Sequence, residues 1–405
     1  MSGSIEDKHS RESFPLVPRF SKQGFTTNEI KMRREWLQNL AATELGQVGA
    51  YSLDSESMRG NIENAIGTVQ VPLGVAGPLK IEGEHAHGTF YVPLATTEGA
   101  LVRSYERGMM AVTRSGGVHV RVSSEGNRAC PIFSFECVES SHRFCSQLKD
   151  HFCSIKEIAE STTKHGRLVH IHARQIGRDA VVDFQYDTAD AHGMNMVSKA
   201  TDAVCSWLIE QFDIVKYYVL TGGSSEKRAS AALFQGGKGK HVTAGLCLPA
   251  NIVRSYLKTT PKNIFHMWQR TLLAQIQAGV LGFNGHYANG LAAIFIACGQ
   301  DVANVTNSAV GITNFDVMEN GDLYASVTLP SLTVGTIGGG TGLGTGRECL
   351  NLLDCYGAGK ATKFAEIIAA TILAGELSFG AALASGGFVE AHETYGRNRP
   401  PIALS

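Results

Sequence analysis

Two charged residues stand where a folded chain could use them for proton transfer. Glu98, in Thr96-Thr-Glu-Gly99, lies between a strand-like stretch and a helical one. A carboxylate there either caps the helix or, when partly desolvated, donates a proton at neutral pH. Lys227, in Glu226-Lys-Arg228, follows a strand and a Gly/Ser turn. It belongs either to a solvated charge cluster or to a site where negative charge develops on oxygen.

Two further segments have the chemistry of a ligand site. Asp301 closes the apolar run 294–300, and a carboxylate at a helix C-terminus is unfavourable with the helix dipole. Asp301 is therefore either a loop residue or the partner of a cation such as a lysine. The stretch Asp190-Ala-His-Gly-Met-Asn-Met196 opens a helix, and helix N-termini bind phosphate and other anions. Its methionines also fit an ordinary core.

The glycine-rich run 335–344 and the C-terminal tail each have two interpretations, one structural and one functional. Glycine at this density indicates a tight turn, or a backbone that approaches a ligand or a facing subunit closely. His392 lies in a polar tail beside Glu393 and Arg397, where a histidine is either merely exposed or catalytic. The chain contains no strict G-x-G-x-x-G and no P-loop motif, so neither nucleotide fingerprint is supported.

Composition limits the class of protein. The 405 residues are 43% hydrophobic and 18% charged, and the formal charge is 36 − 37 = −1. This excludes disorder and gives no general field for nucleic acid or an anionic membrane. Nine cysteines without a C-x-x-C pair argue against a zinc site and for reduced thiols. With no apolar export signal, and Glu376 inside the apolar stretch 367–388, we expect a soluble cytoplasmic protein without a metal.

The pattern of helices and strands predicts an α+β fold. Residues 1–25 form a loose arm, and Thr26 with Glu29 has the capping-box spacing that starts a helix. From 52–59 the pattern changes to short strands and glycine turns, and the prolines and glycines of 71–79 exclude a helix. Further helical stretches are 264–281, 287–299 and 363–385.

Residues 131–220 have the order of a separate unit. Their strand-like stretches are 132–138, 167–174, 180–186 and 214–220, and their helical ones are 141–160 and 193–212. The resulting β-α-β-β-α-β order is ferredoxin-like. We therefore predict four parts: an N-terminal arm and helical segment (1–50), a large mixed domain (51–130 plus 221–388), an inserted domain (131–220) and a mobile C-terminal tail (389–405).

Several of these stretches occur together, in this order, in one known family. The chain resembles 3-hydroxy-3-methylglutaryl-CoA (HMG-CoA) reductases from about Glu63 to Arg397. The matching stretches are Glu63–Gly67, Pro72–Leu79, Pro93–Gly99, Asp190–Met196, Gly299–Asp301 and Gly335–Thr341. The match is to the first sequence class of that family, in a soluble form without the membrane anchor.

The resemblance implies reduction of HMG-CoA to mevalonate and CoA by two NADPH, through a mevaldyl-CoA hemithioacetal. Lys227 matches the lysine that stabilises the oxyanion, and Glu98 matches the acid that protonates it. Asp301 matches the aspartate that links the two. His392 matches the tail histidine that protonates the leaving thiolate.

The resemblance also implies residues that bind ligands. Arg128 matches the arginine that holds the HMG carboxylate, Asn289 matches an active-site asparagine, and Arg107 lies at a CoA position. The implied cofactor residues are Asp190, His192, Gly193, Met194 and Asn195 at the nicotinamide and Lys164 and Arg397 near the 2′-phosphate. Positive charge near that phosphate favours NADPH over NADH.

Several positions depart from the family pattern. Glu226 and Arg228 replace the aspartate and lysine that normally flank the catalytic lysine, and Arg270 stands where a substrate-binding lysine is expected. Arginine keeps the charge but requires a planar fork geometry. His192 replaces a methionine of the cofactor motif, and Ala391 replaces the serine before the tail histidine.

The resemblance implies an assembly as well. The inserted domain 131–220 would bind NADPH, and the 63–67 segment would lie at the interface of an obligate homodimer or higher homo-oligomer. The tail beyond Gly386-Gly387 would close over the site. Two alternatives stay open: a divergent paralogue that reduces a related acyl-CoA or serves as an inhibitor-tolerant copy, and a catalytically silent partner protein. The second alternative requires a lost catalytic residue, and all four are present.

Overall fold

The computed structural model describes residues 15–20, 24–218 and 227–386, and the chain divides between Gln70 and Val71 into two compact units. The N-terminal unit begins with α1 (Thr27–Ala41), which is closed by the predicted capping box of Thr26 and Glu29. The short helix α2 (Gly46–Gly49) and the 3-10 turn η1 (Ser55–Met58) follow, and Ile30 packs on Met58.

The change to short strands predicted near 52–59 comes later in the structure, since these residues contain η1 and the first strand begins at Leu73. Asp54 accepts a hydrogen bond at 3.3 Å from the backbone N–H of Glu56, and this local bond closes η1 instead of leaving the backbone extended. Short polar side chains compete with strand pairing in this way.

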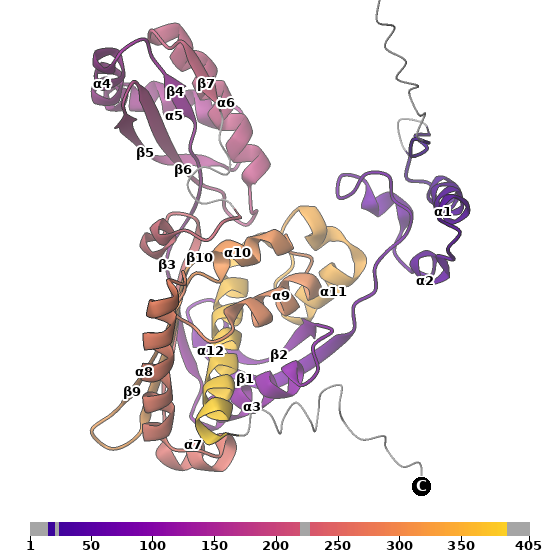
Figure 1. Ribbon diagram of the computed structural model, residues 1–405, viewed down its shortest axis with the longest axis vertical. Coiled ribbons are helices and arrows are strands. Elements are labelled where there is room, and N and C mark those ends of the chain that lie inside the picture. The colour runs from indigo at the N-terminus through magenta and orange to yellow at the C-terminus, as the bar shows by residue number, and fades with distance from the viewer. Residues whose placement is uncertain (1–14, 21–23, 219–226, 387–405) are drawn as a thin grey trace, which may run out of the picture. The chain divides into compact units, whose positions relative to one another are not determined.

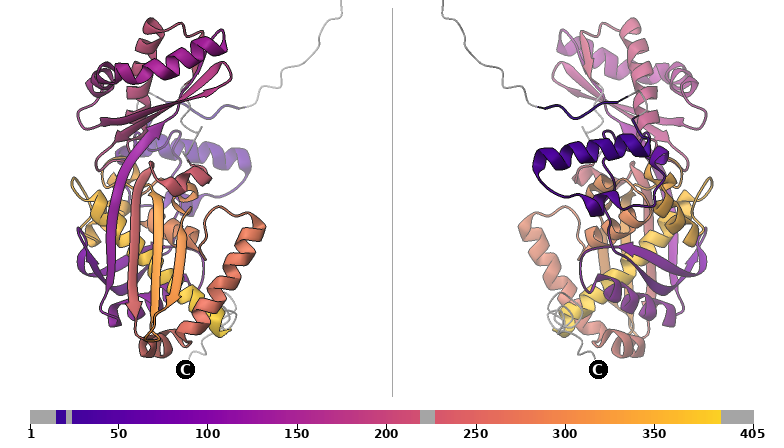
Figure 2. Two further views of the ribbon diagram at one scale, coloured as in Figure 1. Left: turned by 90° about the vertical axis from the view of Figure 1, so that its left-hand side faces the viewer. Right: turned by 90° about the vertical axis from the view of Figure 1, so that its right-hand side faces the viewer.

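The unit from Val71 onward is built on one mixed sheet that runs through both of its halves (Figure 1). Its paired order is β7-β4-β6-β3-β8-β10-β9, with β1 and β2 attached through β3, and β5 through β6. The long strand β3 (Val118–Ala129) joins the halves, because residues 119–126 pair with β8 and residues 127–129 pair with β6. Figure 2 shows β3 running from one half into the other.

The larger half packs its helices against one face of the sheet. Its other strands are β1 (Leu73–Gly83), β2 (His87–Ala95), β8 (Gly239–Leu248), β9 (Ile312–Val317) and β10 (Leu323–Leu332). Its helices are α3 (Leu101–Arg114), α7 (Ala250–Leu257), α8 (Pro261–Ala278), α9 (Tyr287–Ala297), α10 (Val305–Ser308), α11 (Gly344–Leu352) and α12 (Ala361–Ser385), with the 3-10 turns η3 (Ala231–Gln235), η4 (Val302–Asn304) and η5 (Gly339–Gly342). The stretches predicted as helices at 264–281, 287–299 and 363–385 are α8, α9 and α12.

Helix α12 is the centre of the larger core. It lies against β3, β8 and β10, and it is buried along most of its length (Figure 2). Among the described residues it is the one helix long and apolar enough to cross a membrane, and 83% of its apolar window is buried inside the protein. A 25-residue core helix of this kind needs no lipid to cover it.

The smaller half has the predicted β-α-β-β-α-β order. Its strands are β4 (Ile132–Ser134), β5 (Arg167–Ile176), β6 (Asp179–Asp187) and β7 (Lys216–Tyr218), and its helical elements are α4 (Val138–Gln147), η2 (Leu148–His151), α5 (Phe152–Ser161) and α6 (Met194–Gln211). All three strand pairs are antiparallel, and the helices bury a core of their own that includes Phe133, Phe144 and Phe184.

The first strand of this half ends earlier than predicted. Strand β4 stops at Ser134, because the chain turns into α4 at Val138 and buries Ser141 and Phe144 from a helix. The α+β class with a mixed sheet is as predicted. The boundaries 1–50, 51–130 plus 221–388, 131–220 and 389–405 stay a prediction.

Candidate active site

Lys227 and Asp301 form an ion pair, with Lys227 Nζ 2.9 Å from Asp301 Oδ2. The same carboxylate accepts a hydrogen bond at 3.1 Å from the backbone N–H of Ala303 and so caps η4. Partial burial alone would raise the pKa of Asp301, but the hydrogen bond from Lys227 and its charge outweigh burial and lower that pKa. The two side chains remain 43% and 40% exposed, so a ligand can reach the pair.

The backbone at Lys227 is unusual. Its φ of 48° lies in the left-handed region, which residues with a side chain seldom occupy and which is concentrated at functional sites. The next residue, Arg228, is exposed. Glu226 and the turn before it lie outside the described residues.

A second pair joins Glu98 to Asn289. Asn289 Nδ2 donates to Glu98 Oε2 at 3.0 Å, and the backbone N–H of Glu98 donates to Thr96 Oγ1 at 2.9 Å. Helix α3 begins after Ala100 without a side-chain cap, so Glu98 does not serve as the cap of that helix. Its carboxylate is directed to the first turn of α9 instead.

The two pairs lie at opposite ends of α9. Asn289 is in the first turn of that helix, and Asp301 follows its last residue, Ala297, by four positions. A helix of 11 residues spans about 16 Å. Within one chain, the length of α9 therefore separates the backbone of Asn289, which binds Glu98, from the backbone of Asp301, which binds Lys227.

Asp190 ties three segments together. Its carboxylate accepts hydrogen bonds from the backbone N–H groups of Gly359 (2.7 Å) and Ala361 (3.0 Å), at the start of α12. Its carbonyl accepts from the N–H of Thr336 at 2.9 Å, and Ala191 forms a parallel bridge with Ile337. Asp190, predicted as a cofactor residue, thus holds the Asp190–Met196 segment against the glycine-rich run.

This contact explains part of the glycine-rich run. A Cβ added at Gly335 would lie 2.9 Å from the backbone nitrogen of His192, and one added at Gly340 would lie 2.6 Å from the carbonyl oxygen of Gly299. The sequence left open a tight turn, or an approach to a ligand or a facing subunit. What the described residues show is a close backbone approach within the chain itself, which is neither a ligand nor a subunit contact. Neither glycine can take a side chain without displacing its neighbour.

His192 is fixed and uncharged. Its carbonyl accepts a hydrogen bond from Asn127 Nδ2 at 2.8 Å, and its Nε2 is buried and has no hydrogen-bond partner among the described residues. Burial lowers the pKa of His192 to about 4, and the positive charge of Lys238 contributes to the shift. Asp301 and Lys227 also act on this pKa in opposite directions, so His192 lies within electrostatic reach of the ion pair.

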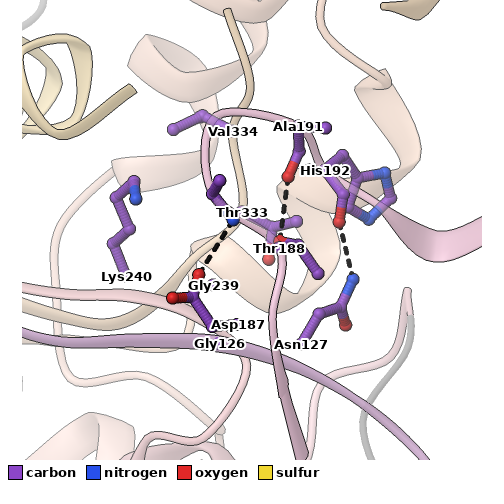
Figure 3. A pocket seen from close by; sticks show the side chains of 11 residues that line it. Gly126, Asn127, Asp187, Thr188, Ala191, His192, Gly239, Lys240, Thr333 and Val334 are labelled. Atoms are coloured by element: carbon purple, nitrogen blue, oxygen red, sulfur yellow. Dashed lines mark hydrogen bonds between the residues drawn. The ribbon is translucent and has the colours of Figure 1, made fainter. Parts of the chain in front are cut away.

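A hollow lies beside His192 (Figure 3). It is small, with a volume of about 20 Å³, and it opens to solvent. Figure 3 shows the loop that carries Thr188, Ala191 and His192 on one side and Lys240 on the other. The residues that line it are Gly126, Asn127, Asp187, Thr188, Ala189, Ala191, His192, Gly239, Lys240, Thr333 and Val334.

Arg128 is already bound within the protein. Its Nη1 donates to Asp183 Oδ2 at 3.0 Å, its Nε donates to the carbonyl of Gly237 at 3.0 Å, and its Nη2 donates to the carbonyl of Gly236. The Arg128 and Asp183 side chains are only 13% and 15% exposed. The arginine expected to hold a substrate carboxylate therefore holds a carboxylate of the chain itself.

Arg107 is also engaged. Its Nε and Nη2 donate to the side chain and carbonyl of Ser378 on α12, at 3.0 and 2.6 Å, and burial lowers its pKa. Gly193 caps α6 with φ 75°, and Met194 packs at the edge of the smaller core. The other predicted ligand residues in the described part of the chain, Lys164, Asn195 and Arg270, are exposed. His392 and Arg397 lie outside the described residues.

The sequence reasoning missed a buried acid beside the site. Glu376, 3% exposed, accepts hydrogen bonds from the N–H groups of Gly285 (2.7 Å) and His286 (2.8 Å), from His286 Nδ1 (2.8 Å) and from Thr313 Oγ1 (2.6 Å). Burial raises its pKa, but the hydrogen bond and charge of His286 outweigh burial and lower it. The available signal was a carboxylate inside an apolar helix, since such a group requires partners.

Fold and site together define a class: an α+β protein in which a ferredoxin-like half continues a larger mixed sheet, with a lysine–aspartate pair near the start of α6. Residues 29–397 match the family model described as hydroxymethylglutaryl-coenzyme A reductase. The chain belongs to that family.

Curated archaeal proteins agree. Over 375 residues the chain is 42% identical to the 3-hydroxy-3-methylglutaryl-coenzyme A reductase of Methanocaldococcus jannaschii, covering 91% of this chain and 92% of that one. The protein of the same name from Aeropyrum pernix is 43% identical over 389 residues, covering 94% and 92%. The chain thus spans almost the full length of these relatives.

A solved structure shares the fold at low identity. It is described as the class II 3-hydroxy-3-methylglutaryl-CoA reductase from Streptococcus pneumoniae bound to NADPH in open conformations. Its TM-score is 0.67 at 20% identity, over 90% of this chain and 100% of that one. The class II neighbour contradicts our prediction of the first sequence class. That prediction rested on short motifs around the site, and motifs tied to shared chemistry discriminate poorly between classes.

Proposed function

We propose that this chain reduces (S)-HMG-CoA to mevalonate and CoA with two NADPH, through a mevaldyl-CoA hemithioacetal. The observation that carries the proposal is the Lys227–Asp301 ion pair, which is exposed to a ligand and lies within electrostatic reach of His192 in the Asp190–Met196 segment. Membership in a family of this name supports the substrate.

The residues of the chain fit a dinucleotide at the start of α6. That helix has 18 residues, and its first N–H groups have no partner inside the helix. A buried imidazole nitrogen of His192 beside it has no hydrogen-bond partner within the described ranges. Asp190, His192, Gly193, Met194 and Asn195 would hold the nicotinamide end, and Lys164 and Arg397 the 2′-phosphate. NADPH, when bound there, supplies hydride to the thioester carbon and then to the aldehyde carbon. The solved neighbour's bound NADPH supports this assignment.

The catalytic roles follow from charge and geometry. Lys227 stabilises the oxygen that becomes negative as the carbonyl carbon is reduced, and Asp301 keeps the ammonium group charged and oriented. Glu98 gives that oxygen its proton. When the carbon–sulfur bond of the hemithioacetal breaks, His392 protonates the departing thiolate. Each positioned proton donor is worth about 10²–10⁴-fold in rate.

The remaining substrate residues are proposed with defined tasks. Exposed Arg228 and Arg270 bind carboxylate or phosphate groups, and Asn289 orients Glu98. Arg107 and Arg128 act through elements that they already hold, namely α12 and the Gly236-Gly237 turn. In this proposal residues 131–220 are the NADPH-binding domain and the protein acts in the cytoplasm.

We also propose an obligate homodimer with shared active sites. The length of α9 between the two pairs supports this, because a partner chain can bring its Glu98 to the Lys227–Asp301 pair of the first chain. A mixture of Glu98→Gln and Lys227→Ala proteins, refolded together, should then recover about a quarter of wild-type activity, since half of the dimers carry one intact site. No recovery would place each site within one chain.

The direct test is NADPH oxidation in the presence of HMG-CoA. Wild-type protein should consume two NADPH for each mevalonate formed, and Lys227→Ala should lose about 10²–10³-fold in kcat. Lys149→Ala, at an exposed lysine of η2, is the matched control and should keep full activity. Full activity of Lys227→Ala would remove the proposed oxyanion role. Initial rates with NADPH and NADH at saturating HMG-CoA measure the cofactor preference.

One observation favours a second candidate, a related acyl-CoA as substrate. Arg128 is neutralised by Asp183, so the chain depends less on a terminal carboxylate than the family pattern implies. Comparing kcat/KM for HMG-CoA with that for 3-hydroxy-3-methylbutyryl-CoA, which lacks the carboxylate, separates the candidates. A preference for the second compound would support the divergent paralogue.

A further inference from the structure

A second, larger hollow lies in the smaller half, between α4 and the C-terminal end of α6. Its volume is about 280 Å³, against about 20 Å³ for the hollow beside His192. Gln211, the last residue of α6, and the two residues after it line this α4–α6 pocket. The helix has 18 residues and spans about 27 Å, and the Asp190–Met196 segment lies at its other end. The pocket is therefore separate from the candidate active site.

The α4–α6 pocket has two walls and an aromatic floor. Positions 140, 143, 144 and 147 of α4 line one wall, and this spacing places them on one face of the helix. Residues 211–213 line the other wall. The rings of Phe144 and Phe212 meet edge to face with their centroids 5.0 Å apart, and the ring of His151 packs on Phe212 at 5.3 Å. Such a surface fits a ligand with an aromatic body.

The polar side chains of the pocket carry both signs of charge. Arg143 lies on the α4 wall, Asp213 lies on the opposite wall, and Asp150 of η2 also lines the pocket. None of the three has a hydrogen bond or an ion pair with another of the described residues. The last carbonyl groups of α6 add partial negative charge on the side of Asp213. The pocket thus offers a guanidinium group on one wall and negative charge on the other.

These charges decide what kind of ligand fits. An organic anion would match Arg143 but leave Asp213 without a partner, and an organic cation would do the reverse. A zwitterion matches both walls, and the aromatic floor requires that it carry an apolar ring. Hydrogen bonds between ionised groups are about twice as strong as neutral ones, so both ends of a zwitterion would contribute to binding.

We propose that the α4–α6 pocket binds a free α-amino acid with an aromatic side chain. Its carboxylate would bind Arg143, its ammonium group would bind Asp213, and its ring would pack on Phe212. Arg143 and Asp213 are exposed, so the amino acid can enter from solvent without a change of fold. The volume of about 280 Å³ is close to the lower end of small-molecule sites, about 300 Å³. The inference is independent of the proposed function, because none of the described residues that line the pocket belongs to the candidate active site.

The test is a ligand-observed NMR titration of the full-length protein with three probes. L-Phenylalanine carries both charges, 3-phenylpropionate lacks the ammonium group, and phenethylamine lacks the carboxylate. L-Phenylalanine should bind with a Kd on the order of 1 mM or below. Each analogue should bind at least about tenfold more weakly, the range of one hydrogen bond between charged groups.

Two variants assign the charges to residues. In Arg143→Gln, L-phenylalanine should bind about tenfold more weakly and no better than phenethylamine, because its carboxylate has lost its partner. In Asp213→Asn, it should lose its preference over 3-phenylpropionate for the corresponding reason. Arg254→Gln, at an exposed position of α7, and Asp316→Asn, on β9, are the matched controls and should bind all three probes like the wild type.

Three results would overturn the inference. The first is a Kd above about 10 mM for L-phenylalanine and the wild-type protein. The second is an analogue that binds as tightly as L-phenylalanine, since the pocket would then recognise one charge only. The third is an equal loss of affinity in Arg143→Gln and Arg254→Gln, which would place the binding elsewhere. A wild-type protein that binds L-phenylalanine but does not reduce HMG-CoA would overturn the proposed function alone.

Discussion

Two acids, Glu376 and Asp301, lie at the two ends of helix α9 and differ in exposure and in hydrogen bonding. Before its first turn, Glu376 is 3% exposed and accepts four hydrogen bonds, two of them from the backbone N–H groups of Gly285 and His286. Beyond its last turn, Asp301 is 40% exposed and forms an ion pair with Lys227. One end is closed and fully bonded, and the other is open to a ligand.

This difference distinguishes a group that stabilises the fold, Glu376, from a group that a ligand can reach, Asp301. A buried carboxylate whose lone pairs are all bound cannot exchange a partner for a substrate without a large cost, so Glu376 fixes the start of α9. His286, which donates to it, is stacked between Tyr105 and Phe379 and cannot turn away. The exposed pair has weaker restraints, and it can rearrange around a ligand. Functional sites need both, a rigid support and an accessible group.

The largest effect should follow from removing the buried acid. Glu376→Ala leaves two backbone N–H groups, an imidazole and the hydroxyl of Thr313 without their acceptor. We expect the free energy of unfolding to fall by about 3–5 kcal/mol, as when one partner of a buried ion pair is removed. Urea unfolding of the full chain measures it, with Glu319→Ala, at an exposed position, as the control. A loss below about 1 kcal/mol would show that this end of α9 is not the rigid one.

The exposed acid should show the reverse balance. Asp301→Asn keeps the shape but removes the charge that holds Lys227, so we expect kcat to fall about 10²–10³-fold. Stability should change by less than about 1 kcal/mol, because water screens a pair that is two-fifths exposed. HMG-CoA-dependent NADPH oxidation and urea unfolding measure the two effects. Asp316→Asn, at an exposed position of β9, should alter neither. A large loss of stability in Asp301→Asn would erase the contrast between the ends.

The sequence predicted elements better than contacts. Helices α1, α8, α9 and α12 were predicted because capping residues and a 3.6-residue period are local signals. The register of β3 against β6 is not local, so the pairing of Arg128 with Asp183 could not be foreseen. The same holds for Glu376 and His286, which are 90 residues apart.

The same holds for the candidate site: its residues were predicted from motifs, whereas some of their contacts were not. Glu98, Lys227 and Asp301 were chosen by motif, and the Lys227–Asp301 contact at 2.9 Å agrees with the cationic partner that a carboxylate after an apolar helix required. Asp190 was chosen as a cofactor residue, but its carboxylate binds the start of α12, a contact across 169 and 171 residues. Only the tertiary structure shows that this motif, predicted to bind the cofactor, holds the start of α12.

Lowering the pH should reduce the free energy of unfolding through protonation of His192. A histidine titrates near 6.5 in the unfolded chain, whereas His192 titrates at about 4 in the folded one. Between these values the unfolded state binds more protons, so stability is lost as the pH falls through this window. The loss from about pH 7 to about pH 5 should be about 2 kcal/mol.

The measurement is urea unfolding of the wild type and of His192→Met at both pH values. The variant should lack this part of the pH dependence, because methionine does not titrate. The charged groups that act on His192 (Lys238, Lys227 and Asp301) are unchanged in it. An equal loss of stability at the lower pH in both proteins would assign the effect to other groups and would contradict the role of His192.

The smallest effect should come from Asn289, which faces the site from the closed end of α9. Asn289→Ala removes the amide that donates to Glu98 at 3.0 Å but leaves the Glu376 network intact. We expect kcat to fall about tenfold, close to 1.4 kcal/mol, because a solvated carboxylate keeps water as a substitute partner. Stability should stay within about 0.5 kcal/mol of the wild type. Asn251→Ala, on the exposed side of α7, controls for the loss of an amide. A loss as large as that of Asp301→Asn would mean that both ends of the helix act on the reacting atoms, and the division between support and chemistry would fail.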